Sequence, residues 1–123
     1  MNKKVNITGE LTQITKYFTP RIIGEVNDVY IKLVKVKGEE VPWHIHDNED
    51  ELFFVLKGSL VMQQKSCNDF IMNEGDLFIV PKGVEHRISA DKECHHLLVE
   101  NKTSKHTGNV KSLITTSIEE QSY

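Results

Sequence analysis

The chain has 123 residues, a length that supports one domain with a single hydrophobic core and leaves no room for a second. Its formal net charge is −3, from 15 basic and 18 acidic residues, and the basic residues form no dense block. This charge pattern argues against nucleic acid and against an anionic membrane surface as partners.

The cysteines and the N-terminal residues bear on where the protein works. Cys67 and Cys94 show no spacing typical of a disulfide framework or a metal site. Lys3 and Lys4 are followed by no apolar run of the kind found in a signal peptide or a membrane anchor. We therefore expect a cytoplasmic protein in a reducing compartment, with a small molecule as its partner.

The first element expected along the chain is a short amphipathic helix over residues 8–18. Its apolar residues recur at spacings of three, three and one, Thr8 is the expected N-cap, and Pro20 prevents the helix from continuing. Residues 1–19 should therefore form a helical arm ahead of the main domain.

Residues 20–102 carry short runs of Val, Ile, Leu and Phe separated by turn residues, a pattern typical of a sandwich or a barrel. Turn-forming residues are expected to close hairpins at 27–28, 57–58, 67–69 and 74–76. The predicted strands are 22–26, 30–37, 41–46, 51–57, 59–64, 70–72, 77–80, 86–89 and 93–100. Residues 103–123 are rich in Ser, Thr and Lys, and we expect a polar tail that packs on the barrel or is partly disordered.

The predicted strand 51–57 is apolar on both faces. Phe53 and Val55 point to one side, and Leu52, Phe54 and Leu56 point to the other. One face can line a barrel interior, while the other must meet a second sheet, the N-terminal helix or another subunit. We expect a homodimer.

The segment with the most chemical information is Gly38, five residues, His44, one residue, His46, four residues, Glu51, six residues and Gly58. Two histidines at i and i+2 point to the same side of a strand, and a carboxylate shortly downstream can return from the neighbouring strand to complete the set. Two neutral imidazoles and a carboxylate suit first-row divalent metals such as Fe, Mn, Ni, Co or Zn. The segment therefore predicts a metal site on a hairpin.

A second group follows as Gly75, five residues, Pro81, one residue, Gly83, two residues and His86. Gly75 permits a turn conformation, and Pro81 and Gly83 shape a tight connection out of the preceding strand. His86 begins the next predicted strand and is a possible fourth ligand.

Together these two groups resemble the two sequence motifs of the cupin superfamily. The first motif is matched at every position and the second up to its last, where Ala90 stands in place of asparagine. The resemblance implies an all-β fold, a small antiparallel jelly-roll β-barrel, here with a short N-terminal helix. It also implies a divalent transition metal held by His44, His46, Glu51 and His86.

The choice of carboxylate rests on spacing and strand parity. Glu49, Asp50 and Glu51 are adjacent, but only Glu51 leaves the six residues of the motif before Gly58. Asp50 would point to the opposite face of the strand, and Glu49 is expected in the turn. Apart from the one ligand, the acidic run is expected to be solvated.

Other residues that could carry chemistry have simpler interpretations. His95 and His96 are adjacent and face opposite sides, so at least one is a surface or packing residue, and neither is expected in the site. Cys94 is expected to be a small buried or edge residue, and Trp43 to pack outside the barrel or in a subunit contact. His106 lies in the polar tail and is expected to be exposed to solvent.

Three histidines and one carboxylate leave about two positions open on an octahedral metal. We therefore expect a small metalloenzyme that acts on a small oxygen-rich metabolite, of isomerase or oxygenase type. The alternative is a non-catalytic module or sensor that binds a small molecule or a metal, and both stay open at this point. A phosphosugar substrate is disfavoured because the inward positions near the ligands are mostly apolar.

Overall fold

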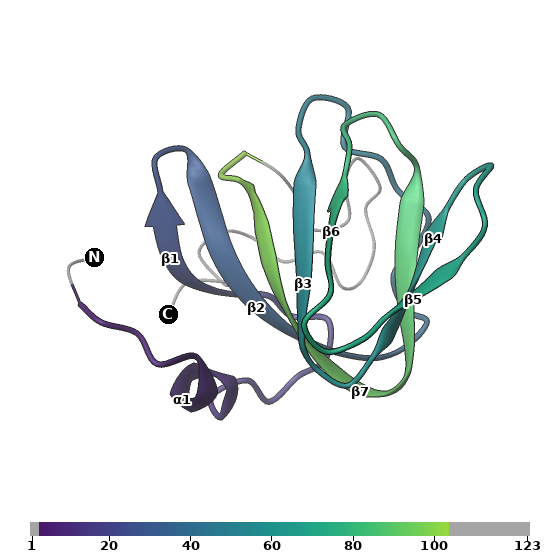
Figure 1. Cartoon of the computed structure of the whole chain (residues 1–123). Helices are drawn as coiled ribbons and strands as arrows, with labels where there is room; N and C mark the ends of the chain where they lie inside the picture. The colour runs from purple at the N-terminus through teal and green to yellow at the C-terminus, as the bar shows by residue number, and fades with distance from the viewer. Residues whose placement is uncertain (1–2, 104–123) are drawn as a thin grey trace.

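The computed structural model describes residues 3–103, where one short helix precedes a set of strands that curve around a common interior (Figure 1). The elements are α1 (Ile7–Leu11), β1 (Arg21–Val26), β2 (Val29–Gly38), β3 (Glu51–Lys57), β4 (Leu60–Gln64), β5 (Phe70–Met72), β6 (Leu77–Val80) and β7 (His86–Asn101). No helix in this part of the chain has the length and apolar character needed to cross a membrane. The predicted tail, His106 included, lies outside the described residues from residue 104 onward.

Strand β7 organises the fold because its 16 residues take part in both sheets. Its later residues lie between β2 and β3, and that sheet continues to β1 beyond β2 and to β6 beyond β3. Its first residues, 86–89, pair with β4, which pairs in turn with β5. Since these pairings are antiparallel and β7 leads from one sheet into the other, the expected jelly-roll β-barrel with a short N-terminal helix is confirmed.

Most predicted strand boundaries agree with the structure to within one residue. The predicted break between 86–89 and 93–100 is wrong, because β7 contains no glycine or proline and stays extended throughout. The predicted strand at 41–46 is also wrong, since only His44 forms an isolated bridge there, to His86. Pro42 has no backbone N–H to offer a ladder, so the segment remains a loop.

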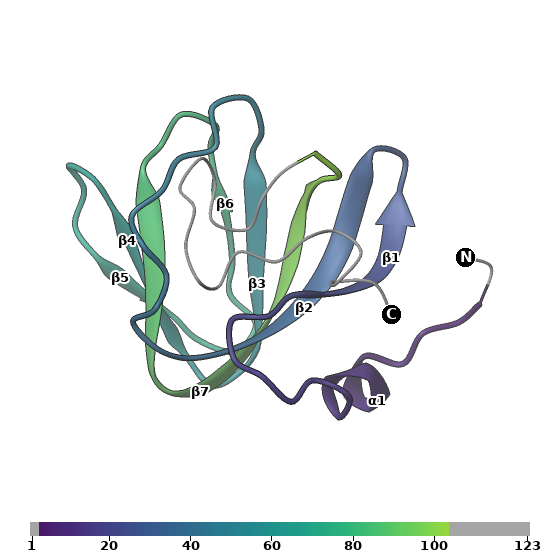
Figure 2. The same cartoon turned by 180° about the vertical axis from the view of Figure 1, so that it is seen from behind.

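The N-terminal arm is less helical than predicted. The helix ends seven residues earlier than expected, and Asn6 rather than Thr8 is the N-cap, through a side-chain hydrogen bond of 2.8 Å. The chain then follows an irregular path along one end of the barrel before β1 begins (Figure 2). Ile14 and Phe18 are buried in two different apolar clusters, whereas a continuous helix would place these i and i+4 residues on one face.

Two apolar clusters fill the fold. The larger lies inside the barrel and includes Phe18, Val34, Val36, Val41, Phe53, Val55, Leu60, Met62, Met72, Val80, Ile88, Ala90, Cys94 and Leu98. The smaller is formed by Ile14, Ile23 and Leu33, with the partly buried Leu56 and Leu97 packed against it. Residues of the N-terminal arm therefore help to cover the outer face of β3 at Leu56. The N-terminal segment was one of the three coverings expected for that face.

Candidate metal centre

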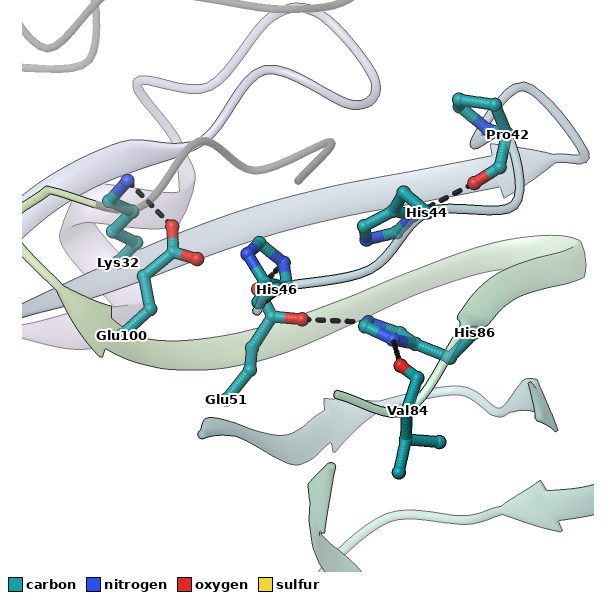
Figure 3. A network of polar contacts seen from close by, with 8 residues as sticks. All are labelled: Lys32, Pro42, His44, His46, Glu51, Val84, His86 and Glu100. Carbon is teal, nitrogen blue, oxygen red and sulfur yellow. Dashed lines mark hydrogen bonds and ion pairs between the residues drawn. The ribbon is translucent and has the colours of Figure 1, made fainter. Parts of the chain in front are cut away.

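Four side chains from separate parts of the chain meet inside the barrel. His44 and His46 lie on the connection between β2 and β3, Glu51 is the first residue of β3, and His86 is the first residue of β7. One potential ligand atom from each of them lies within 4.8 Å of the others, and all four residues are buried. The structure therefore brings together the four residues that the sequence predicts as ligands (Figure 3).

Backbone contacts fix the relative positions of the histidines. The His44 and His86 main chains bond to each other in both directions, at 3.0 and 2.9 Å. The Gly83 N–H donates to the His46 carbonyl at 2.8 Å, which ties the second histidine to the loop that precedes β7. The connection and this loop are thus held side by side, and the three imidazoles converge.

Backbone carbonyls also orient two of the imidazoles. His44 Nδ1 lies 2.8 Å from the carbonyl of Pro42, and His86 Nδ1 lies 3.0 Å from the carbonyl of Val84 (Figure 3). A carbonyl can only accept, so Nδ1 carries the proton in both rings and Nε2 of the neutral ring keeps its lone pair. This is the arrangement in which a histidine binds a metal through Nε2.

Several atoms of the cluster lack a hydrogen-bond partner among the described residues. These buried atoms without a partner are His44 Nε2, His46 Nε2 and Glu51 Oε2. His46 Nε2 lies 3.3 Å from Glu51 Oε2, but the geometry is too poor for a hydrogen bond. Glu51 Oε1 lies 3.0 Å from His86 Nε2. Buried unpaired lone pairs are unfavourable unless something satisfies them, and a divalent cation among these atoms would do so. The donor set therefore fits a metal.

The environment places two of these four groups, His44 and Glu51, in the protonation state that ligation requires. Burial and the neighbouring His86 lower the pKa of His44 to about 4. Burial would raise the pKa of Glu51, but its close contacts with the imidazoles of His46 and His86 outweigh burial and hold that pKa well below the usual range. At neutral pH His44 is therefore neutral and Glu51 is ionised.

His46 behaves differently. Burial lowers its pKa, but the close contact with Glu51 and the charges of Glu51, Glu49 and Asp47 outweigh burial and raise the pKa above 6.5. A proton therefore competes with a metal for His46 at a higher pH than for His44. His46 should limit metal binding in acid.

We expect metal occupancy to fall as the pH is lowered through the pKa of His46, from nearly full at about pH 8 to mostly lost at about pH 5. The direction follows because a raised pKa favours the protonated imidazole at lower pH, and that form cannot bind. Elemental analysis after dialysis across this range measures the loss. Unchanged occupancy at pH 5 would mean that the metal is held elsewhere.

The three adjacent acids occupy different places. Glu51 belongs to the cluster, and it is 2 % exposed. The Asp50 carboxylate accepts from the Lys82 N–H at 2.9 Å at an exposed position, and Glu49 is only half-buried. Among the described residues the geometry therefore singles out Glu51 from this run.

A cavity lies against the cluster and is lined chiefly by apolar side chains. Its wall consists of Phe18, Pro20, Val34, Val36, Val41, His44, Glu51, Phe53, His86, Ile88, His96 and Leu98. The space that the centre of a water molecule can occupy is about 30 Å³, which is small for a ligand pocket. The cavity is therefore small and mostly apolar beside a polar cluster.

The expectation that His96 lies away from the site is wrong. Its imidazole lines the cavity, packs against Phe53 with ring centres 5.3 Å apart, and has an Nε2 with no partner among the described residues. Burial lowers its pKa to about 4, so the ring is neutral at physiological pH. Alternation from His86 would have placed His96 on the inner face, but the predicted break within 86–101 removed that signal.

A buried ion pair inside the barrel was also missed. Lys32 Nζ donates to Glu100 Oε1 at 2.8 Å, and the two side chains are 0 % and 1 % exposed. The Glu100 carboxylate lies between Lys32 and Glu51 (Figure 3). Burial, and then the charge of Glu51, raise the pKa of Glu100 well above the usual range against the opposing effect of Lys32.

Lys32 is a basic side chain that faces inward among positions that are otherwise mostly apolar, as the sequence predicts for those near the ligands. It shares strand parity with Val34 and Val36, two interior residues, so alternation along β2 contained the signal. Because Glu100 already pairs with the ammonium group, Lys32 adds little capacity to bind a phosphate.

Trp43 and Cys94 lie as expected. The Trp43 ring lies against Lys65 and Arg87, whose cationic groups are 4.2 and 4.6 Å from its centre, and it does not line the cavity. Cys94 is a fully buried member of the interior cluster.

Comparison with known proteins adds three relationships and a family. Residues 33–100 match the family model described as a cupin domain. Over 105 residues, 85% of this chain and 92% of the other, the sequence is 31% identical to the uncharacterized protein YdbB of Bacillus subtilis. The crystal structure of a cupin-2 domain containing protein from Shewanella frigidimarina is 35% identical, with a TM-score of 0.76, and the match covers 80% of this chain and 94% of that one.

A third relationship is partial. The chain is 31% identical over 67 residues to 3-hydroxyanthranilate 3,4-dioxygenase of Shewanella woodyi. This match covers 52% of the chain and only 35% of the dioxygenase. It therefore extends over a barrel-sized portion of that enzyme and not over the whole of it.

Proposed function

The chain belongs to the cupin family, and from this premise we propose that it is a small metalloenzyme acting on a small oxygen-rich metabolite. His44, His46, Glu51 and His86 would hold a divalent transition metal, which can be Fe, Mn, Zn, Ni or Co. The observation that carries this proposal is the convergence of three buried, unpaired ligand atoms on one point. When bound, such a metal supplies Lewis-acid polarisation or oxygen chemistry at its open positions.

The other residues of the cavity have roles that follow from their surroundings. The mainly apolar wall lowers the local dielectric constant, which strengthens polar interactions inside the cavity. His96 is a neutral imidazole with an unpaired Nε2, so it would form a hydrogen bond to a bound metabolite. The contacts of His44 and His86 with backbone carbonyls hold their rings in place before anything binds.

The cavity favours oxygenase-type chemistry over phosphosugar isomerisation. A sugar phosphate needs several hydrogen-bonding groups and an unpaired cation, whereas this wall is mainly apolar and Lys32 is already paired. The partial similarity to a dioxygenase supports the same choice.

The alternative is a binding module or sensor that does not turn over its ligand. The small size of the cavity favours this second candidate, since the free space beside the cluster is well below that of a typical substrate pocket. The two candidates share the metal and differ only in whether chemistry follows binding.

The deciding experiment begins with elemental analysis of the purified protein and of a His46→Ala control. The metal-loaded protein is then screened for O2 consumption with small keto acids and diols, and for isomerisation of sugar phosphates. Turnover that disappears in the control supports the metalloenzyme. A folded, metal-loaded protein that is inert in every assay supports the binding module, and a protein that takes up no metal contradicts both.

We also place the protein in the cytoplasm, with a small molecule as its partner. Cys67, which is exposed, and Cys94, which is buried, are both free thiols, as expected in a reducing compartment. The cavity beside the cluster is where the small molecule would bind.

A homodimer formed through the outer face of β3 and β6 is part of the proposal. Leu52 lies opposite Ile79 and Phe54 opposite Leu77 in the antiparallel register, and Leu77 and Ile79 are 55% and 47% exposed. An exposed apolar face of this kind supports association. We expect Leu77→Asp to halve the mass measured by sedimentation, whereas a wild-type protein that sediments as a monomer would exclude the dimer.

A further inference from the structure

The wall of the cavity is completed by the N-terminal arm. Phe18 and Pro20 line it together with His44, Glu51 and His86, although both precede the first strand of the barrel. Phe18 is 2 % exposed and belongs to the interior cluster. A side chain from outside the strands therefore forms part of the wall of the cavity that three candidate ligands also line.

The backbone at Phe18 is held in an unfavourable conformation. Its φ is +56°, in the left-handed region that a bulky residue rarely adopts. The Phe18 N–H donates to the Lys35 carbonyl at 2.8 Å, which holds the residue against β2. Strained residues that the surrounding structure holds in place are concentrated at ligand sites.

Two further contacts anchor the arm just before this residue. Lys35 Nζ donates to the Ile14 carbonyl at 3.1 Å, and the Tyr17 hydroxyl donates to Glu93 Oε1 at 2.7 Å. The arm is thus fixed to β2 and β7 on the approach to Phe18. The ring is held in the cavity wall by the fold around it, so it sets the free space beside the cluster.

We propose that Phe18 is the specificity-determining residue of the site and limits its ligands to small aliphatic molecules that chelate through two oxygens. The free space beside the cluster is small, about 30 Å³, and the Phe18 ring forms part of its wall, so a bulky substituent on a ligand bound there competes with that ring for space. Removal of the Phe18 side chain would add the volume of a phenyl ring to the same cavity. This inference rests on the proposed function, because it defines the ligand class of that site.

Two hydroxamates provide a matched pair of probes. Acetohydroxamate and benzohydroxamate present the same two chelating oxygens, and they differ in carrying a methyl group or a phenyl ring. Their affinities for the cobalt-loaded protein are measured from the visible spectrum of the metal. The ratio of the two affinities reports the space beside the metal and is insensitive to a general loss of stability.

We expect the wild type to bind acetohydroxamate at least about tenfold more tightly than benzohydroxamate, and Phe18→Ala to abolish or invert that preference. Phe18→Leu should give an intermediate ratio, and it replaces Phe18→Ala in the comparison if the alanine variant does not fold. Phe54→Ala is the control, since Phe54 lies on β3 with the parity opposite to the cavity residue Phe53, and its ratio should match the wild type. Equal binding of both probes by the wild type, or a ratio unchanged in the Phe18 variants, overturns the proposal.

A second measurement separates this inference from the proposed function. If no metal binds, toluene is added to the metal-free protein and the imidazole resonances of His86 and His96 are followed by NMR. Shifts of these resonances in Phe18→Ala and not in the wild type support the size limit even when the metal site fails. Similar shifts in both proteins, or in neither, contradict it.

Discussion

Replacing Glu51 with Gln is expected to lower the affinity for a divalent metal by at least about 100-fold, whereas Glu49→Gln should change it by less than about threefold. Glu51 is the carboxylate of the four-residue cluster, and its ionised form is strongly favoured in the folded protein. Gln keeps the shape but removes the charge that offsets the cation, and it places an N–H₂ group near two imidazoles. Competition with a chelator of known affinity measures both variants.

Glu49→Gln is a matched control because it makes the same chemical change two residues away. Its charge reaches His46 through space, so it has a small electrostatic effect without ligation. The difference between the two variants therefore isolates coordination from charge. Equal losses in both variants, or a larger loss for Glu49→Gln, would show that Glu51 is not the ligand.

The barrel and the cluster could be predicted because each depends on short-range regularities. Strand 51–57 has apolar residues on both faces and is followed by a turn glycine. Both features are local to the sequence, and the strand has the predicted bounds in the structure. His44 and His46 share a face in any extended chain, even though their segment is a loop with one bridge instead of a strand. The spacing therefore located the cluster although the local structure was assigned wrongly.

The missed features depend on contacts between distant segments. The helical period of residues 8–18 is real, but burial of Phe18 inside the barrel overrides it. His96 was misplaced because β7 runs through residues 90–92, where the sequence predicts a gap between two strands. Lys32 has the same strand parity as the inward residues of β2. Lysines are rarely buried unless they are paired, and its partner, Glu100, lies 68 residues away, so the sequence pattern alone did not reveal the pair.

The second large effect is expected at the Lys32–Glu100 pair. Glu100→Leu should lower the free energy of unfolding by about 3–5 kcal/mol, because it leaves a fully buried ammonium group without a partner. The double variant Lys32→Met/Glu100→Leu should recover most of this loss, since it removes both buried polar partners together. Denaturant unfolding of the metal-free proteins measures all three changes and completes the double-mutant cycle with Lys32→Met.

Lys32→Met should be less harmful than Glu100→Leu, because the carboxyl group can escape its unpaired state by taking up a proton. Burial and Glu51 already raise the pKa of Glu100, and loss of Lys32 removes the charge and hydrogen bond that lower it. A raised pKa means that the folded protein binds the proton more tightly than the unfolded chain, so stability increases as the pH falls. The deficit of Lys32→Met relative to the wild type should therefore shrink as the pH is lowered. A deficit that grows in acid, or a double variant less stable than Glu100→Leu, would show that the pair does not act as a buried, mutually neutralising unit.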